Sequence, residues 1–231
     1  MPEAALTWPL LGEAMQPRGS GALWLPASRT LVVSDLHLGK AERNARRGGG
    51  LWPPYENAET LTRLDHEIAA CDPACIVALG DSFDDDACVE GLDPETRGRI
   101  EAMVAARRWI WVTGNHDPAP TGLDGDSADA VTLGALTLRH IAEASACGEI
   151  SGHYHPKARL RIRGRRIARK CFLASAGRII LPAFGAFTGG LDVLDPVFAP
   201  LFDRDACVIL TGDRPVMVPC THLRRMAARS L

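Results

Sequence analysis

The sequence predicts an α/β fold with a β-rich final third. Over the first two thirds of the chain, uncharged runs rich in β-branched residues alternate with segments that have helical spacing. From Arg159 onward the pattern changes to short alternating stretches separated by tight turns, which is typical of strands. At 231 residues the chain is long enough for one domain with a sizeable core, so we expect a single domain over residues 1–231.

Each expected element follows from a local pattern. A strand is predicted where a short run is apolar or β-branched, and a helix where apolar residues recur every three or four positions. Asp93 ahead of Pro94 marks one helix start, because aspartate caps helix N-termini and proline suits the first turn. Residues 1–29 are expected to form an irregular or hairpin lead-in, and residues 40–54 a polar, glycine-rich loop. The expected strands are 30–33, 75–79, 109–112, 136–138 and 149–151, and the expected helices are 57–70 and the segment after Asp93.

The composition is that of an ordinary globular protein. Hydrophobic residues make up 46% and charged residues 23% of the chain, and the net charge of -2 means that the chain as a whole does not attract polyanions. The seven cysteines, without a Cys-x-x-Cys pair, favour reduced thiols in a cytoplasmic protein. No apolar run approaches the ~20 residues of a membrane helix, so we expect no membrane partner, and the oligomeric state stays open.

Five short blocks place metal-binding side chains directly after expected strands. Aspartate, asparagine and histidine form a mixture that holds two divalent metals side by side, and ligands of α/β folds collect at the carboxyl ends of strands. Paired metals suit in-line attack at phosphorus, so hydrolysis of a phosphate ester is the leading hypothesis. The blocks are Asp35-Leu36-His37, Gly80-Asp81-Ser82-Phe83-Asp84, Gly114-Asn115-His116-Asp117, His140 and Gly152-His153-Tyr154-His155.

Several of the blocks also have an ordinary structural interpretation. His153 and His155 could share a metal site, because side chains two apart in an extended segment point the same way. The same holds for Asp35 and His37, although an aspartate there could equally cap a turn. Asp81 could bridge two metals with one oxygen to each, but Gly-Asp is also a common turn. The metal interpretation is strong because all five blocks occur in order, each after a strand.

The ordered set resembles the motif series of the calcineurin-like metallophosphoesterase superfamily over residues 30–155. That series is Asp-x-His, Gly-Asp-x-x-Asp, Gly-Asn-His-Asp/Glu, a lone histidine and Gly-His-x-His. The resemblance implies a four-layer α/β/β/α metallophosphoesterase sandwich that holds two metal ions. It implies Asp35, His37, Asp81 and His155 as ligands of one metal, and Asp81, Asn115, His140 and His153 as ligands of the other.

The resemblance also implies two catalytic residues. His116 would be the general acid or would stabilise the phosphoryl group, and Asp84 would orient it. Oxygen and imidazole ligands without thiolates suit manganese, iron or zinc, and manganese is our first expectation. His140 departs from the superfamily pattern, because Ile141 follows it where glycine is common, and a lone histidine is often structural.

A closer likeness extends to nearly the full chain. Two segments are similar to those of the bacterial ligase-associated DNA damage response metallophosphoesterases: Ser34-Asp35-Leu36-His37-Leu38-Gly39-Lys40 and Leu181-Pro182-Ala183-Phe184-Gly185-Ala186-Phe187-Thr188-Gly189-Gly190-Leu191. This likeness implies a phosphodiesterase or endonuclease that acts on nucleic acid in DNA repair, with a DNA ligase and a helicase as partners.

A dense basic segment follows the last block. Arg159, Arg161 and Arg163 alternate with apolar residues, so a strand would present these arginines on one face, where they could track a nucleic-acid backbone. Lys40 and Arg43 in the expected loop are further candidates for substrate binding. The alternative is that the arginines protect an exposed strand edge from pairing with other chains.

Two other functions stay open. One is a phosphohydrolase of a small or lipid-linked pyrophosphate, because Ser-Asp-Leu-His-Leu also occurs in the diacylglucosamine pyrophosphate hydrolases of the lipid A pathway. Those enzymes usually have arginine at the position of His116, and a lipid would need a larger apolar cap than residues 85–108 offer. The other is a non-catalytic scaffold of the same fold, which would be expected to have lost ligands that this chain retains.

Overall fold

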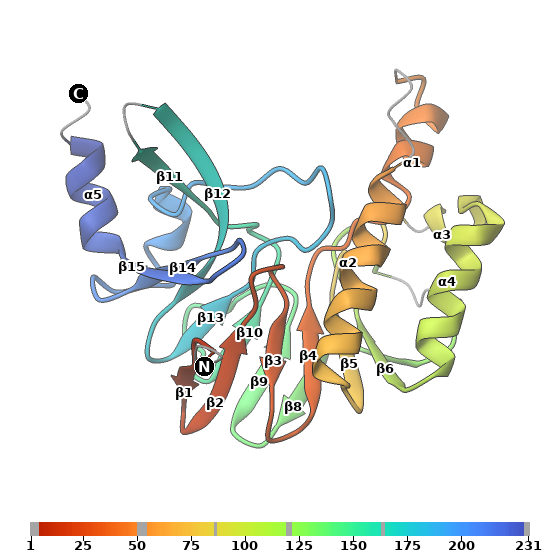
Figure 1. The fold of residues 1–231 in the computed structure, drawn as a ribbon, viewed down its shortest axis with the longest axis horizontal. Helices are drawn as coiled ribbons and strands as arrows, with labels where there is room; N and C mark the ends of the chain where they lie inside the picture. The colour runs from red at the N-terminus through yellow and green to blue at the C-terminus, as the bar shows by residue number, and fades with distance from the viewer. Residues whose placement is uncertain (1–4, 50–54, 86, 119–121, 163–164, 229–231) are drawn as a thin grey trace.

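The computed structural model describes residues 5–49, 55–85, 87–118, 122–162 and 165–228. Two β-sheets lie face to face, and helices pack on the outer face of each sheet (Figure 1). This arrangement confirms the α/β class and the four-layer sandwich expected from the sequence.

The first sheet contains the predicted strands of the N-terminal half. β4, β5 and β6 match the strands predicted at 30–33, 75–79 and 109–112, and they pair in parallel. Within residues 1–29 the irregular alternative is wrong and the hairpin is correct: β1 and β2 form a hairpin, and β3 pairs with β4. The sheet order is β1 (Trp8–Leu10), β2 (Glu13–Pro17), β3 (Leu23–Leu25), β4 (Thr30–Val33), β5 (Cys75–Leu79), β6 (Arg108–Val112) and β7 (Asp126–Ala128).

The second sheet accounts for the β-rich final third. Strand β9 and strand β10 match the predictions at 136–138 and 149–151, and they pair in parallel. Strand β11 pairs with β12 alone, and Figure 1 shows this hairpin projecting away from the sandwich. The sheet order is β15 (Val216–Pro219), β14 (Cys207–Leu210), β12 (Arg165–Ala174), β13 (Arg178–Ile180), β10 (Glu149–Ser151), β9 (Leu136–Arg139) and β8 (Ala130–Leu133), with β11 at Lys157–Ile162.

The helices pack their apolar faces against the two sheets. α2 (Glu56–Cys71) and α4 (Pro94–Ala105) confirm both predicted helices, and the Asp93 side chain accepts the N–H groups of Glu95 and Thr96. The loop predicted at 40–54 is wrong over residues 40–46, because α1 (Lys40–Arg46) consists largely of good helix formers, and residues 50–54 lie outside the described residues. The remaining helices are α3 (Cys88–Gly91), η1 (Pro196–Phe198) and α5 (Cys220–Ala228). Across the described part of the chain, no helix has the length and apolar character to cross a bilayer.

A hydrophobic core fills the space between the two sheets. Val32, Val77 and Ile110 of the first sheet face Ile150 and Ile209 of the second, and all are buried. The sheets also meet at an edge, where the N–H of Gly212 donates to the carbonyl of Gly19 at 2.9 Å.

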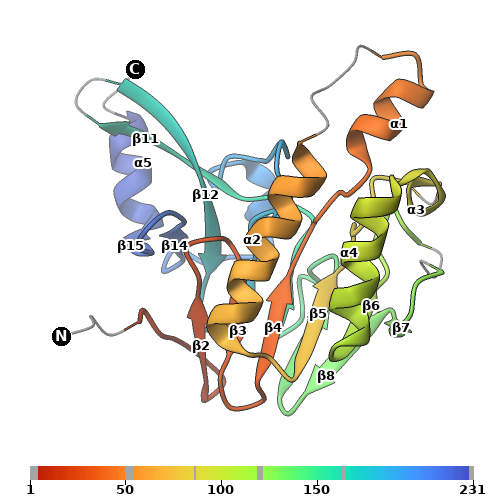
Figure 2. The ribbon, with the colours of Figure 1, turned by 45° about the vertical axis from the view of Figure 1, so that its right-hand side comes forward.

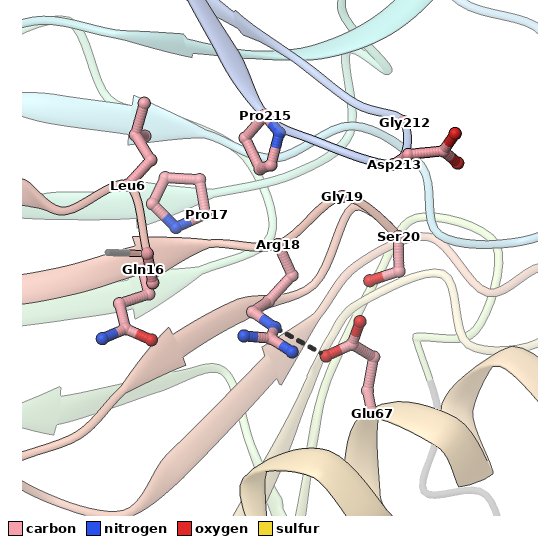
Figure 3. A pocket seen from close by; sticks show the side chains of 11 residues that line it. Leu6, Gln16, Pro17, Arg18, Gly19, Ser20, Glu67, Gly212, Asp213 and Pro215 are labelled. Atoms are coloured by element: carbon pink, nitrogen blue, oxygen red, sulfur yellow. Dashed lines mark hydrogen bonds and ion pairs between the residues drawn. The ribbon is translucent and has the colours of Figure 1, made fainter. Parts of the chain in front are cut away.

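A hollow of about 480 Å³ lies beside this edge contact (Figure 3). Across it, Nε of Arg18 donates to Glu67 at 2.8 Å. Loop residues Gly19 and Ser20 line the hollow together with the turn that begins at Gly212. None of the predicted metal ligands is among its lining residues, so this hollow is separate from the candidate site.

Replacing Ile209 by alanine should lower the free energy of unfolding by about 2–5 kcal/mol, because the side chain is fully buried between the sheets. Met217→Ala is the matched control, since Met217 lies opposite Ile209 on strand β15 but is 52% exposed. The control should change stability by less than about 0.5 kcal/mol. Urea unfolding of the two variants measures both values, and equal losses would contradict the inter-sheet core.

Candidate metal centre

The predicted ligands converge at one end of the sandwich. Asp35 follows β4, Asp81 follows β5, Asn115 follows β6, His140 follows β9 and His153 follows β10. Parallel strands end at the same edge of a sheet, and the two sheets are stacked, so blocks that are distant in sequence meet there.

The first ligand group contains Asp35, His37 and His155. Nε2 of His155 lies 3.1 Å from Oδ1 of Asp35 and 3.4 Å from Nε2 of His37. Oδ2 of Asp81 lies 3.9 Å from Nε2 of His37. These three residues and Asp81 are the four that the family resemblance implied as ligands of one metal.

The second ligand group contains Asn115, His140 and His153. Nε2 of His140 lies 3.0 Å from Oδ1 of Asn115, 3.3 Å from Nδ1 of His153 and 3.4 Å from Oδ2 of Asp81. The sequence supported His140 less than any other ligand. In the structure His140 lies at the centre of its group.

The carboxylate of Asp81 joins the two groups through one oxygen. Oδ2 faces both His37 and His140, whereas Oδ1 accepts the backbone N–H of His116 at 2.9 Å. Asp81 therefore lies between the two groups, as a bridging ligand would, and the expected division of its oxygens between two metals stays a prediction.

Contacts on the far side of each ring place the protons of His37 and His140. Nδ1 of His37 lies 3.0 Å from a carboxylate oxygen of Asp84, and Nδ1 of His140 lies 3.1 Å from the carbonyl of Leu79. We therefore assign each proton to Nδ1, which leaves a lone pair on each Nε2. Each of these lone pairs lies close to a nitrogen of another imidazole and is repelled by it. A cation bound between the two nitrogens removes that repulsion. The donor set thus fits a pair of metal ions.

The carboxylates of the site are held in the charged form that a cation needs. Burial disfavours the charge on Asp81, but its neighbours His140 and His37 and the backbone N–H of His116 together outweigh burial and lower the pKa of Asp81 to about 2. Burial also opposes the charge on Asp35, and His155 lowers its pKa.

The ligand residues have a strained backbone rather than an extended one. Asp35, His37, Asp81, His153 and His155 have φ values of 53°, 46°, 48°, 70° and 48°. The extended segments predicted for the two ligand pairs are therefore wrong, although both members of each pair reach the site. Left-handed backbone at such residues costs about 1–3 kcal/mol each and persists only where the surrounding structure enforces it.

Two glycines make room for the ligands. A Cβ atom at Gly80 would clash with the ring of His140, and one at Gly152 would clash with Ser34 and with the carboxylate of Asp35. The glycines ahead of Asp81 and His153 are therefore required by close approach within the site.

Asp117 holds the loop that carries Asp81. Its buried carboxylate accepts the backbone N–H groups of Asp81, Ser82 and Phe83 at 3.0, 2.7 and 3.1 Å. Burial raises the pKa of Asp117 to about 6, and the neighbouring charge of Asp81 acts in the same direction. Sequence reasoning gave Asp117 no role, and its place at the end of the Gly-Asn-His-Asp block was the available signal.

Asp84 contacts His116 through its main chain rather than through its side chain. Nδ1 of His116 donates to the backbone carbonyl of Asp84 at 2.9 Å, so the main chain orients this ring. The Asp84 carboxylate turns away, toward His37 at 3.0 Å and Nη1 of Arg43 at 2.8 Å. These two partners outweigh burial and lower the pKa of Asp84 to about 2.

Arg43 is engaged by acidic side chains rather than exposed to a substrate. Besides its contact with Asp84, its Nε lies 3.6 Å from Asp85. Arg43 therefore positions Asp84 in this structure, and its predicted contact with a substrate stays a prediction. Lys40 lies one turn earlier in the chain and begins α1.

The predicted basic face is described only in part. Arg159 is 76% exposed, and its Nε lies 3.1 Å from the carboxylate of Asp192. Arg161 lies in β11, two residues further along the strand, and Arg163 lies outside the described residues. Figure 2 shows the β11–β12 hairpin and α1 rising from the end of the sandwich at which β4 and β5 terminate. These elements therefore flank the metal-ligand groups.

Residues 181–191, which we call the strap, pass behind Asp35. The N–H of Gly185 donates to the backbone carbonyl of Asp35 at 3.1 Å. Nζ of Lys170 donates to the carbonyls of Ala183 and Gly185 at 2.8 and 2.6 Å, and burial lowers the pKa of Lys170 to about 7. Sequence reasoning gave Lys170 no role of its own and missed this contact.

Comparison with known proteins agrees with this geometry. Residues 28–174 match the family model of the calcineurin-like phosphoesterases. The chain is similar to the crystal structure of the nuclease MPE of Pseudomonas putida, with 28% sequence identity and a TM-score of 0.69, over 92% of this chain and 100% of that one. A conserved uncharacterized protein of Streptococcus pneumoniae TIGR4, a predicted phosphoesterase, shows 12% identity and a TM-score of 0.32 over 82% of this chain and 95% of that one. No curated protein sequence matches the chain.

The purified protein should contain two divalent metals, and Asp81→Asn should lose metal and abolish phosphoesterase activity, because Oδ2 of Asp81 faces both ligand groups. Elemental analysis and hydrolysis of an aryl phosphodiester measure the two effects. Asp65→Asn, at a surface ion pair with Arg99, is the control and should leave both values unchanged. A folded wild-type protein without bound metal would contradict the assignment.

Proposed function

The chain belongs to the calcineurin-like phosphoesterase family, and from that premise we propose that it is a metal-dependent phosphodiesterase that cleaves nucleic acid in DNA repair. The observation that carries the proposal is the convergence of two ligand groups on one oxygen of Asp81. The family depends on two metals, and the side chains that would hold them here are those of the two groups described above.

The residues around the metal ligands have distinct roles in the proposed reaction. When bound, two divalent metals activate water and neutralise charge on the phosphoryl oxygens. His116 is held through Nδ1 by the carbonyl of Asp84, so a ring protonated at Nε2 has a second N–H for the leaving oxygen or a phosphoryl oxygen. Proton donation of this kind contributes ~10²–10⁴ in rate. Asp84 and Arg43 keep Nε2 of His37 directed at the first group.

Manganese is the proposed metal, with iron or zinc as alternatives. The two groups offer carboxylate, amide and imidazole donors, and oxygen and nitrogen ligands without thiolate suit these ions.

Two observations support nucleic acid as the substrate. The similar Pseudomonas putida protein is a nuclease. The basic β11–β12 hairpin begins two residues after His155, and Arg159 on it is exposed. A cytoplasmic location and a DNA ligase or helicase partner remain predictions from the sequence and its likeness alone.

A lipid-linked substrate is less well supported. The apolar side chains described within residues 85–108 pack into the core against the first sheet, with Val89, Ile100 and Met103 among them. They therefore form no exposed apolar cap over the site. A panel of substrates tests the choice: an aryl phosphomonoester, an aryl phosphodiester, single-stranded DNA and duplex DNA, each with and without manganese. Cleavage of the monoester alone would overturn the proposal.

His116→Ala should lower turnover by about 10²–10⁴-fold while metal content stays near two per chain, because His116 is assigned to the substrate. A substrate with a good leaving group needs less protonation and should show a smaller loss. His116 also lies within 4.8 Å of donor atoms of His37 and Asp81, so elemental analysis is the decisive measurement. Loss of metal from the folded variant would make His116 a ligand instead.

Replacing Arg159, Arg161 and Arg163 together by glutamine should weaken DNA binding without regard to sequence. For each DNA phosphate that is no longer neutralised, the slope of log affinity against log salt should flatten by ~0.7–0.9. Hydrolysis of a small aryl phosphodiester should barely change, because the ligand groups lie outside this segment. The charge-matched control replaces Arg97, Arg99 and Arg108, which pair with the exposed acids Glu101, Asp65 and Asp126. An unchanged salt slope with greater aggregation would favour protection of the strand edge.

A further inference from the structure

We propose that Phe187, in the strap, is a stacking platform for a nucleobase next to the metal centre. The inference rests on the proposed function and names a contact of that same site. Phe187 is 58% exposed and has a φ of 53°, so an aromatic side chain is presented to solvent from a left-handed backbone. Such a conformation persists only where its surroundings enforce it.

The strap places Phe187 close to the ligands. Gly185, two residues earlier, donates its N–H to the backbone of Asp35. Two residues of chain span at most ~7 Å, so the backbone of Phe187 lies near the first ligand group. On the other side of Phe187, Leu191 donates its N–H to the carbonyl of Tyr154, next to His155. Figure 1 shows this segment running between β12 and α2.

The backbone on both sides of Phe187 is held in place. The N–H of Ala186 donates to Oγ1 of Thr60 at 2.9 Å. Oγ1 of Thr188 donates to the carbonyl of Gly185 at 3.1 Å, and Nζ of Lys157 donates to the carbonyl of Thr188 at 3.0 Å. The backbone that carries the exposed ring is therefore held in place. This reduces the entropy that the ring loses when a flat partner stacks on it.

A nucleobase is the partner that fits this position. Aromatic side chains next to cationic groups bind single strands by stacking, which is tolerant of sequence because every base has a flat face. Lys157 lies against the strap and begins the basic strand β11, on which Arg159 is exposed. The metal centre would take the scissile phosphate, the basic strand the neighbouring phosphates, and Phe187 a base beside the scissile bond.

Two single-stranded oligonucleotides of equal length test the proposal, one with normal bases and one abasic throughout. Phe187→Ala should lower kcat/KM on the normal strand by about 5- to 100-fold. The Phe187→Ala variant should keep its activity within about twofold of the wild type on the abasic strand and on a methyl aryl phosphodiester. Phe187→Trp should retain activity on the normal strand, whereas Phe187→Leu, which keeps an apolar side chain without a flat ring, should behave as Phe187→Ala.

Three outcomes would overturn the inference. Unchanged cleavage of the normal strand by Phe187→Ala would remove it while leaving the proposed function intact. Equal losses on both strands would mean that Phe187 only supports the strap. Thermal unfolding and metal content show whether Phe187→Ala folds. If it does not fold, the tryptophan and leucine variants provide the test, and equal activity of these two variants on the normal strand would overturn the inference. A wild type that hydrolyses the aryl diester but neither strand would instead overturn the nucleic-acid function, and this inference with it.

Discussion

The carboxylate of Asp117 holds the element on which the rest of the metal centre depends. By accepting three consecutive N–H groups, it stabilises the loop after β5 in a conformation that Asp81 would not otherwise adopt. The same Gly-Asn-His-Asp block supplies Asn115 as a ligand and the His116 N–H that occupies Oδ1 of Asp81. Oδ2 is thereby left to face both ligand groups. The Gly-Asp block after β5 and the Gly-Asn-His-Asp block after β6 therefore orient each other. The carboxylate of Asp117, which had no predicted role, connects them.

Packing in the core between the sheets offsets the free-energy cost of the strained backbone at this site. Five ligand residues have left-handed backbone, at a cost of about 1–3 kcal/mol each. That cost is large beside the net stability of a typical domain, so it must be offset by packing elsewhere. The buried side chains between the sheets, which include Ile150 and Ile209, provide this packing. The chain thus gives up stability at one end of the sandwich in order to hold its donor atoms close together.

Positive charge near the site serves two purposes. Arg43 and Lys170 are engaged with the protein itself: Arg43 with Asp84, and Lys170 with the carbonyls of the strap. Both act on ligands through an intermediate group, Arg43 on His37 and Lys170 on Asp35. Arg159 is exposed and lies on an element that projects beside the site. A basic residue next to a phosphate-binding centre is therefore assigned by its contacts rather than by its proximity in sequence.

The sequence by itself determined the α/β class, the central strands, helices α2 and α4, and the residues that form both ligand groups. These features are local: a strand or helix is written in a short pattern, and each ligand block follows directly from its strand. For residues 1–29 the sequence left a hairpin and an irregular segment as alternatives, because short strands interrupted by proline and glycine show little periodicity. Helix α1 was missed because it is short and polar and is followed by glycines. Only the tertiary structure decided that one oxygen of Asp81 faces both groups, that Asp84 supports His37, and that Asp117 and Lys170 hold the site. The reason is distance along the chain: His37 and His155 are 118 residues apart, and contacts of that range depend on how two sheets stack, which no local pattern records.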